Sequence, residues 1–202
     1  DIVFSICEWG GNKPWIWGEK AGGNCWRTTG DIVDTWASLY EIGFSQAPLY
    51  KYAGPGHWND PDMMIVGKVG WGSTLHDSRL TPDEQYMHVT LWSLLASPLL
   101  IGCDMTKIDD FTFSLLANSE VIEVNQDPLG KQARQVRAGE KQLWVKELED
   151  SSVAVGLINT TKGKRAISFT RDEIGLGGKC RIRDLWRNKD VGILDKEYST
   201  EV

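Results

Sequence analysis

Apolar residues recur along the first two thirds of the chain in an order that predicts strands alternating with helices. Residues 2–7 form an apolar, β-branched run that ends in polar and glycine residues, which predicts a buried strand. Residues 31–40 carry apolar side chains at helical spacing, and this helix is expected to stop near Gly43. The segment Thr81–Glu84 combines a capping threonine, a proline at the first helical position and a capping-box glutamate. It therefore predicts a helix over 81–97.

The remaining elements of this region are shorter. Strands are expected at 25–28, 62–66 and 99–102, a helix at 109–118, and a segment of ambiguous type at 121–124. Strands that alternate with helices favour a parallel sheet with crossover helices. The long loops, 8–23 and 67–80, both follow predicted strands, and in a (β/α) barrel such loops build the active site.

The pattern changes after residue 134. Short strand-like runs separated by turns occupy the rest of the chain, at 142–148, 153–158, 166–169 and 180–183. These runs predict a small antiparallel β-sandwich. We therefore expect an α/β domain over 1–134 and an all-β domain over 135–202.

Composition narrows the classes of function. The 202 residues are 41% hydrophobic and 25% charged, as in ordinary globular proteins, and the net charge is −6. A negative chain would be repelled by a phosphate backbone, so no nucleic-acid partner is expected. The longest uncharged stretch, Val89–Cys103, is interrupted by Pro98 and is too short to span a bilayer, so no membrane partner is expected.

The cysteines and acidic residues do not predict a metal site. No two cysteines have C-x-x-C spacing, and the three histidines are scattered. Asp60 and Asp62 do not fit the EF-hand pattern, which needs glycine where Ile65 stands. No metal or organic cofactor is expected. Cys7 and Cys25 are open to two interpretations, a disulfide in an oxidising compartment or two reduced buried thiols.

Arg27 and Asp31 are the first candidate chemical pair. Four residues separate them, directly after a predicted strand, so both side chains can reach one cleft. An aspartate in a site that closes over substrate can act as a general acid. Taken alone, the pair fits more simply an aspartate at a helix start with an ordinary ion-pair partner.

Four motifs add a resemblance to a known family. They are Ser5-Ile6-Cys7-Glu8-Trp9-Gly10, Trp26-Arg27-Thr28-Thr29-Gly30-Asp31-Ile32, Gly54-Pro55-Gly56-His57-Trp58-Asn59-Asp60-Pro61-Asp62-Met63 and Val124-Asn125-Gln126-Asp127-Pro128-Leu129-Gly130. In this order they resemble the α-galactosidases of glycoside hydrolase family 27, a group that includes α-N-acetylgalactosaminidases. The resemblance is close over residues 1 to about 135 and looser beyond. It implies a retaining hydrolase of terminal α-linked galactose, built as a (β/α)8 barrel followed by an antiparallel β-sandwich.

The resemblance also assigns residues. Asp31 matches the general acid/base, and Arg27 matches an arginine that binds the sugar beside the nucleophile. The remaining matches line the sugar pocket: Cys7, Glu8 and Trp9 near the 2-position, and Asp62 and Met63 elsewhere in the galactose site. Glu8 would crowd a 2-acetamido group, so galactose is favoured over N-acetylgalactosamine. His57 stands where glycine is common, which leaves the shape of that loop open but touches no catalytic role.

The family's nucleophile, an aspartate in a Lys-Tyr-Asp strand end, has no counterpart here, since Lys51-Tyr52-Ala53 lacks the acid. Residues 2–7 match the fifth barrel strand, so the chain resembles the C-terminal half of the barrel plus a shortened sandwich. A retaining mechanism needs two carboxyl groups about 5 Å apart. We therefore expect these residues alone to be inactive, and to need a complementing N-terminal barrel half or a second copy to cover the strand edge.

Two alternatives to catalysis stay open, a galactoside-binding half-site and an inactive fragment. The resemblance places family members in secretions, periplasm or lysosomes, without choosing among these compartments.

Overall fold

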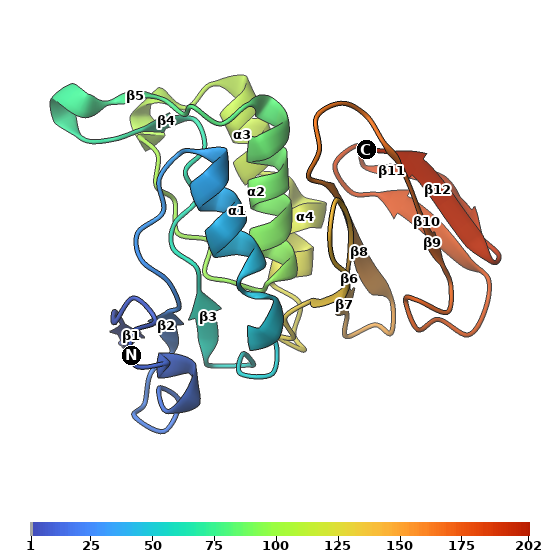
Figure 1. Cartoon of the computed structure of the whole chain (residues 1–202), viewed down its shortest axis with the longest axis horizontal. Coiled ribbons are helices and arrows are strands. Elements are labelled where there is room, and N and C mark those ends of the chain that lie inside the picture. The colour runs from blue at the N-terminus through green and yellow to red at the C-terminus, as the bar shows by residue number, and fades with distance from the viewer. Residues whose placement is uncertain (1) are drawn as a thin grey trace.

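The structure is a computed structural model that describes residues 2–202. It consists of part of a β/α barrel, followed by an antiparallel β domain (Figure 1). The barrel part is built on three parallel strands in the order β1 (Ser5–Ile6), β2 (Cys25–Arg27) and β3 (Trp58–Asp60). Trp26 pairs with Ile6 on one side and with Asn59 on the other, so the three strands end at one edge of the sheet.

The first strand is shorter and less buried than the sequence predicts. Only Ser5 and Ile6 are extended in the sheet, and Ile2, Val3 and Phe4 are exposed. The physical reason is that β1 pairs only with β2, and no other segment within residues 2–202 lies along its second edge. The prediction of a buried strand over 2–7 is therefore wrong for this structure.

The helices of the barrel part pack mainly against one another. The α-helices are α1 (Trp36–Phe44), α2 (Pro82–Leu94), α3 (Asp110–Leu116) and α4 (Ser119–Asn125). The short 3-10 turns are η1 (Pro14–Ile16), η2 (Ala47–Leu49), η3 (Gly72–Thr74) and η4 (Met105–Lys107). The capping box that the sequence predicts is present: Thr81 Oγ1 accepts from Glu84 N, and Glu84 Oε2 accepts from Thr81 N at 2.7 Å. The segment of ambiguous type at 121–124 lies within α4.

The first helix begins later than predicted. Thr35 is the N-cap of α1, its hydroxyl accepting from Ser38 N, so residues 31–35 lie outside the helix. The apolar spacing in 31–35 arises because Ile32 enters the core from a loop. Asp31 is consequently not at the start of this helix, whereas its ion pair with Arg27 is present.

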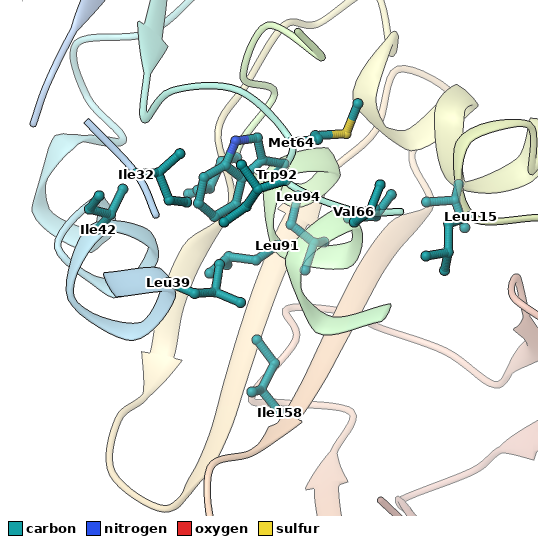
Figure 2. Close-up of a cluster of buried hydrophobic side chains, with 14 of the residues drawn as sticks. Ile32, Leu39, Ile42, Met64, Val66, Leu91, Trp92, Leu94, Leu115 and Ile158 are labelled. Carbon is teal, nitrogen blue, oxygen red and sulfur yellow. The ribbon is translucent and has the colours of Figure 1, made fainter. Parts of the chain in front are cut away.

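The main core lies between the helices, the segment that follows β3 and the first strands of the β domain. Figure 2 shows Trp92 of α2 lying close to Ile32, Leu91 and Leu94. Ile158, from the β domain, belongs to the same cluster. Because the core is closely packed, the buried residues of the loops, such as Ile32, hold these loops in one position.

Two predicted barrel strands are reduced to a single contact. Met64 and Ile101 form one parallel bridge, in which Met64 N donates to Leu100 O at 2.7 Å and Gly102 N donates to Met64 O at 2.9 Å. The strands expected over 62–66 and 99–102 are therefore too long. Asp62 has a φ of +86°, which breaks the extended backbone directly after β3.

The loop expected over 67–80 contains a small hairpin that the sequence pattern does not indicate. Its strands are β4 (Lys68–Val69) and β5 (His76–Asp77), with η3 at the tip. In Figure 1 this hairpin projects from the end of the barrel part toward which β3 points. It is thus on the side of the sheet where the loops after the strands lie.

The β domain contains seven strands: β6 (Arg134–Arg137), β7 (Lys141–Glu147), β8 (Val153–Asn159), β9 (Ala166–Thr170), β10 (Cys180–Asp184), β11 (Lys189–Leu194) and β12 (Glu197–Glu201). They pair antiparallel as β6-β7-β8, β9-β12 and β10-β11. A second core lies between the three-stranded sheet and the other pairs, around Leu143, Val145 and Phe169. The sandwich expected from the sequence is confirmed, and the boundary at 134/135 stays a prediction.

Alternate residues of β7 face different cores. Leu143 and Val145 belong to the core of the sandwich, whereas Trp144 belongs to the core shared with α2. A Cβ added to Gly156, which pairs with Trp144, would lie 2.4 Å from Leu94 Cδ1 of α2. The sandwich and the barrel part are therefore packed in direct contact. No helix described in this structure is long and apolar enough to cross a membrane.

Candidate active site

The carboxyl ends of the three parallel strands bring several predicted site residues together. Arg27 is the last residue of β2, and its Cα partner Asp60 is the last residue of β3. Glu8 follows β1, and Asp62 follows β3 by two residues. This is the edge at which barrels of this class carry their chemistry.

Arg27 lies between two carboxylates. Its Nη2 atom is 2.8 Å from Asp62 Oδ2 and 3.2 Å from Asp31 Oδ1. The same nitrogen also lies 2.9 Å from Gly30 O, so the guanidinium holds the turn that precedes Asp31. The side chains differ in burial: Arg27 is 11% exposed and Asp62 7%, but Asp31 is 71% exposed. Asp31 is thus the carboxylate that a molecule in solution can reach.

Asp62 fixes both sides of the Asp31 loop. Besides contacting Arg27, its Oδ2 accepts a hydrogen bond from Ile32 N at 2.9 Å, while Oδ1 accepts from Met63 N at 2.7 Å. Both oxygens are therefore engaged by the protein. Asp62 is buried, so its geometry suits positioning of the neighbouring acid.

The unusual backbone of Asp62 is stabilised from two directions. Asp62 N donates to Asp60 Oδ1 at 2.8 Å, and Trp92 Nε1 donates to Asp62 O at 2.7 Å. A non-glycine residue at positive φ costs free energy and persists only where its surroundings hold it. Burial raises the pKa of Asp60, and the neighbouring charge of Arg27 opposes this rise.

One face of α2 holds the segment after β3, and the sequence analysis did not identify it. His88 Nε2 accepts from Ile65 N at 3.1 Å, and Gln85 Oε1 accepts from Gly67 N at 3.0 Å. With Trp92, these residues have helical spacing, so they lie along one side of α2. Burial lowers the pKa of His88 to about 3, which keeps its ring neutral and able to accept this bond. Polar residues at this spacing within an apolar helix were the available signal.

Asp34 is a second residue that the sequence analysis missed. Its Oδ2 accepts from Arg79 N at 2.9 Å, and lies 3.1 Å from His76 Nε2. Burial would raise the pKa of Asp34, but hydrogen bonds from Arg79 and His76 outweigh it and hold the pKa at about 2. Asp34 therefore joins the Asp31 loop to the β4–β5 hairpin as a permanent anion. Its position three residues after Asp31 gives no sequence signal for this role.

The residues after β1 follow the first strand of the same sheet. Cys7 and Trp9 are exposed, and Glu8 is half-buried. Trp9 has a φ of +53°, the second non-glycine residue with positive φ among the predicted site residues. Glu8 Oε2 is buried, and has no hydrogen-bond partner among the described residues. A buried carboxylate oxygen without a partner is costly, which makes this atom a candidate for binding a hydroxyl group.

Two further predicted residues are less conspicuous. Met63 is half-buried and packs against the main core. His57 precedes β3 and stacks on Trp26 with ring centroids 6.0 Å apart, at the opposite end of the strand from Asp62. All four cysteines are free, and burial raises the pKa of the Cys25 thiol. Within residues 2–202, no cluster of three or more histidine, cysteine or acidic residues could hold a metal ion.

Comparison with known protein families covers nearly the whole chain. Residues 3–127 match the family described as alpha galactosidase A, and residues 138–202 match the alpha galactosidase C-terminal beta sandwich domain. The chain is 42% identical over 204 residues to an α-galactosidase of Cyamopsis tetragonoloba, covering 100% of this chain and 47% of that protein. It is 40% identical to a probable α-galactosidase of Dictyostelium discoideum, covering 99% of this chain and 51% of the relative.

Solved structures give the same result. A putative α-galactosidase from Bacteroides fragilis has a TM-score of 0.92 at 37% identity, and the match covers 100% of this chain and 45% of that one. A family 27 β-L-arabinopyranosidase from Geobacillus stearothermophilus has a TM-score of 0.89 at 32% identity, with coverage of 100% and 47%. The chain spans about half the length of the relatives that it matches. Its two regions, the motifs around Arg27 and Asp62, and its structure agree: the chain belongs to the α-galactosidase family of glycoside hydrolases, family 27.

Proposed function

We propose that this chain carries the acid/base half of a retaining glycosidase that releases terminal, non-reducing α-linked galactose. Asp31 is the proton donor to the leaving oxygen and then the base for the incoming water. The observation that carries this role is the arrangement around Arg27, which has one buried and one exposed carboxylate partner.

The difference between the two partners supports the assignment. A general acid has to exchange its proton with substrate, which the exposed Asp31 can do and the buried Asp62 cannot. The shorter contact of Arg27 is with Asp62, so the arginine charge is already compensated by a permanent partner. Asp31 is thereby held in place by the loop without being the sole counter-ion of Arg27.

The second carboxylate of the mechanism is proposed to come from outside residues 2–202. Asp62 is unsuited to the nucleophile's role, because both of its oxygens are engaged and its side chain is buried. A retaining enzyme needs the two carboxyl groups about 5 Å apart with the sugar between them. A complementing barrel half is the proposed source, and a second copy of the chain is the alternative.

Galactose is the proposed sugar, with N-acetylgalactosamine as the alternative. The buried, unpartnered Oε2 atom of Glu8 favours a substrate with a free 2-hydroxyl group that can donate to it. An acetamido group there would meet the carboxylate instead. The Cys7–Trp9 segment and Met63 are proposed to line the remainder of the sugar site.

The acid/base role is tested by azide rescue of Asp31→Ala in the full-length protein that carries this sequence. With a poor leaving group, we expect kcat/KM to fall about 10²- to 10⁴-fold, and much less with 2,4-dinitrophenyl galactoside, whose departure needs no proton, while kcat for that substrate should fall because the second step lacks its base. Added azide should restore turnover and give α-galactosyl azide, because azide replaces water at the second step. Formation of the β-azide would instead identify Asp31 as the nucleophile and contradict the proposal.

A separate assay tests the incomplete site. Residues 1–202 expressed alone are expected not to hydrolyse α-galactosides, whereas addition of the barrel half that bears the nucleophile should restore activity. Turnover by the 202 residues alone at the rate of the complete enzyme would contradict the proposed division of the site. Calorimetric binding of galactose without turnover would support the half-site alternative.

A further inference from the structure

Trp92 of α2 donates its one polar hydrogen to the residue that anchors the Asp31 loop. Its Nε1 atom lies 2.7 Å from Asp62 O, and Asp62 has a φ of +86°. The Oδ2 atom of this aspartate accepts from Ile32 N at 2.9 Å and lies 2.8 Å from Arg27 Nη2. The same Nη2 atom of Arg27 lies 3.2 Å from Asp31 Oδ1. The indole N–H is therefore connected to Asp31 through one aspartate and its two partners.

The indole ring of Trp92 has little room to move. It is fully buried and lies close to Ile32 (Figure 2). The ring of His88 meets it edge-on, with ring centroids 4.2 Å apart. A Cβ added at Gly43 of α1 would lie 3.2 Å from Trp92 Cζ3, so glycine at this position gives the indole its space. In a close-packed core, the ring cannot turn away from Asp62 without opening a void.

The fourth sequence motif, Val124–Gly130, supports the backbone of Trp92. Asn125 Nδ2 donates to Ser97 O at 2.9 Å and lies 3.4 Å from Trp92 O. Ser97 Oγ donates to the same carbonyl of Trp92 at 2.9 Å. All three residues are buried, where water does not replace a lost hydrogen bond. Asn125 is thus connected to the indole that supports Asp62.

We propose that Trp92 is a positioning residue for proton transfer by Asp31, and that Asn125 acts through Trp92. The inference rests on the proposed function, and it adds a support that lies in the core of the protein. The positive φ of Asp62 is unfavourable by itself, so it persists only where its surroundings hold it. Without the indole N–H, the buried carbonyl of Asp62 loses its donor, and the peptide can turn toward an ordinary conformation. Because the side chain of Asp62 anchors the loop, this turn displaces Asp31 from the leaving oxygen.

The experiment compares Trp92→Phe with Trp144→Phe in the full-length protein. Both substitutions shrink a fully buried indole of the main core and remove one N–H donor. Trp144 is the matched control, because its Nε1 atom donates to Gln142 Oε1 of its own strand at 2.9 Å. The measurement is kcat/KM for methyl α-galactoside, whose leaving group needs a proton, and for 2,4-dinitrophenyl α-galactoside, whose leaving group does not. The ratio of the two values is independent of how much of a variant is folded.

Trp92→Phe should lower kcat/KM for the methyl galactoside about 10-fold more than kcat/KM for the dinitrophenyl galactoside, because a displaced general acid loses part of its effect. Trp144→Phe should leave the ratio unchanged. Asn125→Ala keeps the indole in place and should change the ratio in the same direction as Trp92→Phe, by about 3-fold. It decides the question if Trp92→Phe does not fold.

The outcomes separate the two proposals. An unaltered protein that hydrolyses neither substrate overturns the proposed function and this inference with it. If the unaltered protein hydrolyses both and the ratio is the same in Trp92→Phe as in Trp144→Phe, the inference alone is overturned, because Trp92 then contributes only to stability. Where Trp92→Phe does not fold, an unchanged ratio in Asn125→Ala overturns the inference instead.

Discussion

Arg27 Nη2 lies 2.8 Å from Asp62 Oδ2, and both side chains are almost fully buried at the carboxyl ends of neighbouring strands. This buried ion pair holds the loop that carries the exposed Asp31. Asp62 also accepts the hydrogen bond of Ile32 N, so a single carboxylate anchors the residues on both sides of Asp31.

Asp62→Asn is expected to reduce both stability and activity. Asparagine leaves Arg27 buried without its closest counter-charge, and breaking a buried ion pair costs about 3 kcal/mol. Chemical denaturation should show that loss in the free energy of unfolding, and kcat should fall at least tenfold as the Asp31 loop loosens. Asp77→Asn is the control, because its ion pair with Lys68 is exposed and worth little. Equal effects of the two substitutions would contradict the anchoring role of Asp62.

Glu8→Ser is expected to change sugar preference. Serine removes the carboxylate that accepts from a 2-hydroxyl group and makes room for an acetamido group. In the full-length protein, kcat/KM for α-N-acetylgalactosaminides should rise and kcat/KM for α-galactosides should fall by about tenfold. Glu19→Ser alters an exposed glutamate of the same loop and should leave the ratio unchanged. An unchanged ratio in Glu8→Ser would refute the assignment of Glu8.

The contact of His76 with Asp34 and Thr74, which joins the β4–β5 hairpin to the Asp31 loop, should depend on pH. Hydrogen bonding to Thr74 O and to Asp34 raises the pKa of His76, so the charged ring is bound more strongly than in the unfolded chain. Its contribution is then complete below the unfolded pKa of about 6.5 and is lost as pH rises through the folded value. Amide exchange of residues 68–77, corrected for intrinsic rates, should show greater protection at pH 5.5 than at pH 8.5. His76→Gln should abolish that difference; persistence of the difference in this variant would assign it to another group.

The pKa of Asp34 sets the lower end of the pH range in which this contact is stabilising. Its pKa is lowered to about 2, so its contribution is present above the unfolded value of 3.8 and is lost only as pH falls toward 2. The contact between Asp34 and His76 is therefore strongest in mildly acidic solution, where Asp34 is ionised and His76 is charged.

Lys146 is expected to cost stability. It is fully buried on β7, its Nζ atom has no partner among the described residues, and burial lowers its pKa to about 8 despite the nearby Asp127. The unfolded chain binds the proton more tightly, so the cost is complete below pH 8 and disappears as pH rises to about 10.5. Lys146→Met should therefore stabilise the protein at pH 7, by up to roughly 3 kcal/mol.

The measurement is the free energy of unfolding of Lys146→Met at pH 7 and at pH 10. The gain should shrink at the higher pH. Lys141→Met, at an exposed position of the same strand, is the control and should change stability little. If Lys146→Met instead destabilised the protein at pH 7, the prediction would be wrong, and the ammonium group of Lys146 would have a stabilising contact beyond those of the described residues.

The sequence predicted the order of elements well, because hydrophobic spacing and capping report local structure directly. The capping box at Thr81 and the strands β7 and β8 are examples. It placed the start of α1 wrongly, because Ile32 has helical spacing but is buried from a loop. It overestimated the strand after Asp60, because the positive φ of Asp62 is maintained by Trp92, thirty residues further along the chain.

The candidate site was predicted in part. Motifs identified Arg27, Asp31 and Asp62, and the structure brings these three together. The motifs did not reveal Asp34 or the polar face of α2, since the roles of these residues depend on partners distant in sequence.

The two faces of β7 limit how the sandwich can be exchanged between related proteins. Trp144 lies in a core with α2, while Leu143 and Val145 lie in the core of the sandwich. Consider a chimaera that joins this barrel part, near residue 130, to the sandwich of a relative. Its β7 and β8 would pack against Leu94 and the other α2 side chains with different shapes, leaving gaps or clashes at the position of Gly156. Exchange of the sandwich between relatives should therefore give a stable protein only when α2 is exchanged with it. The unit that can be exchanged thus includes α2 as well as the sandwich.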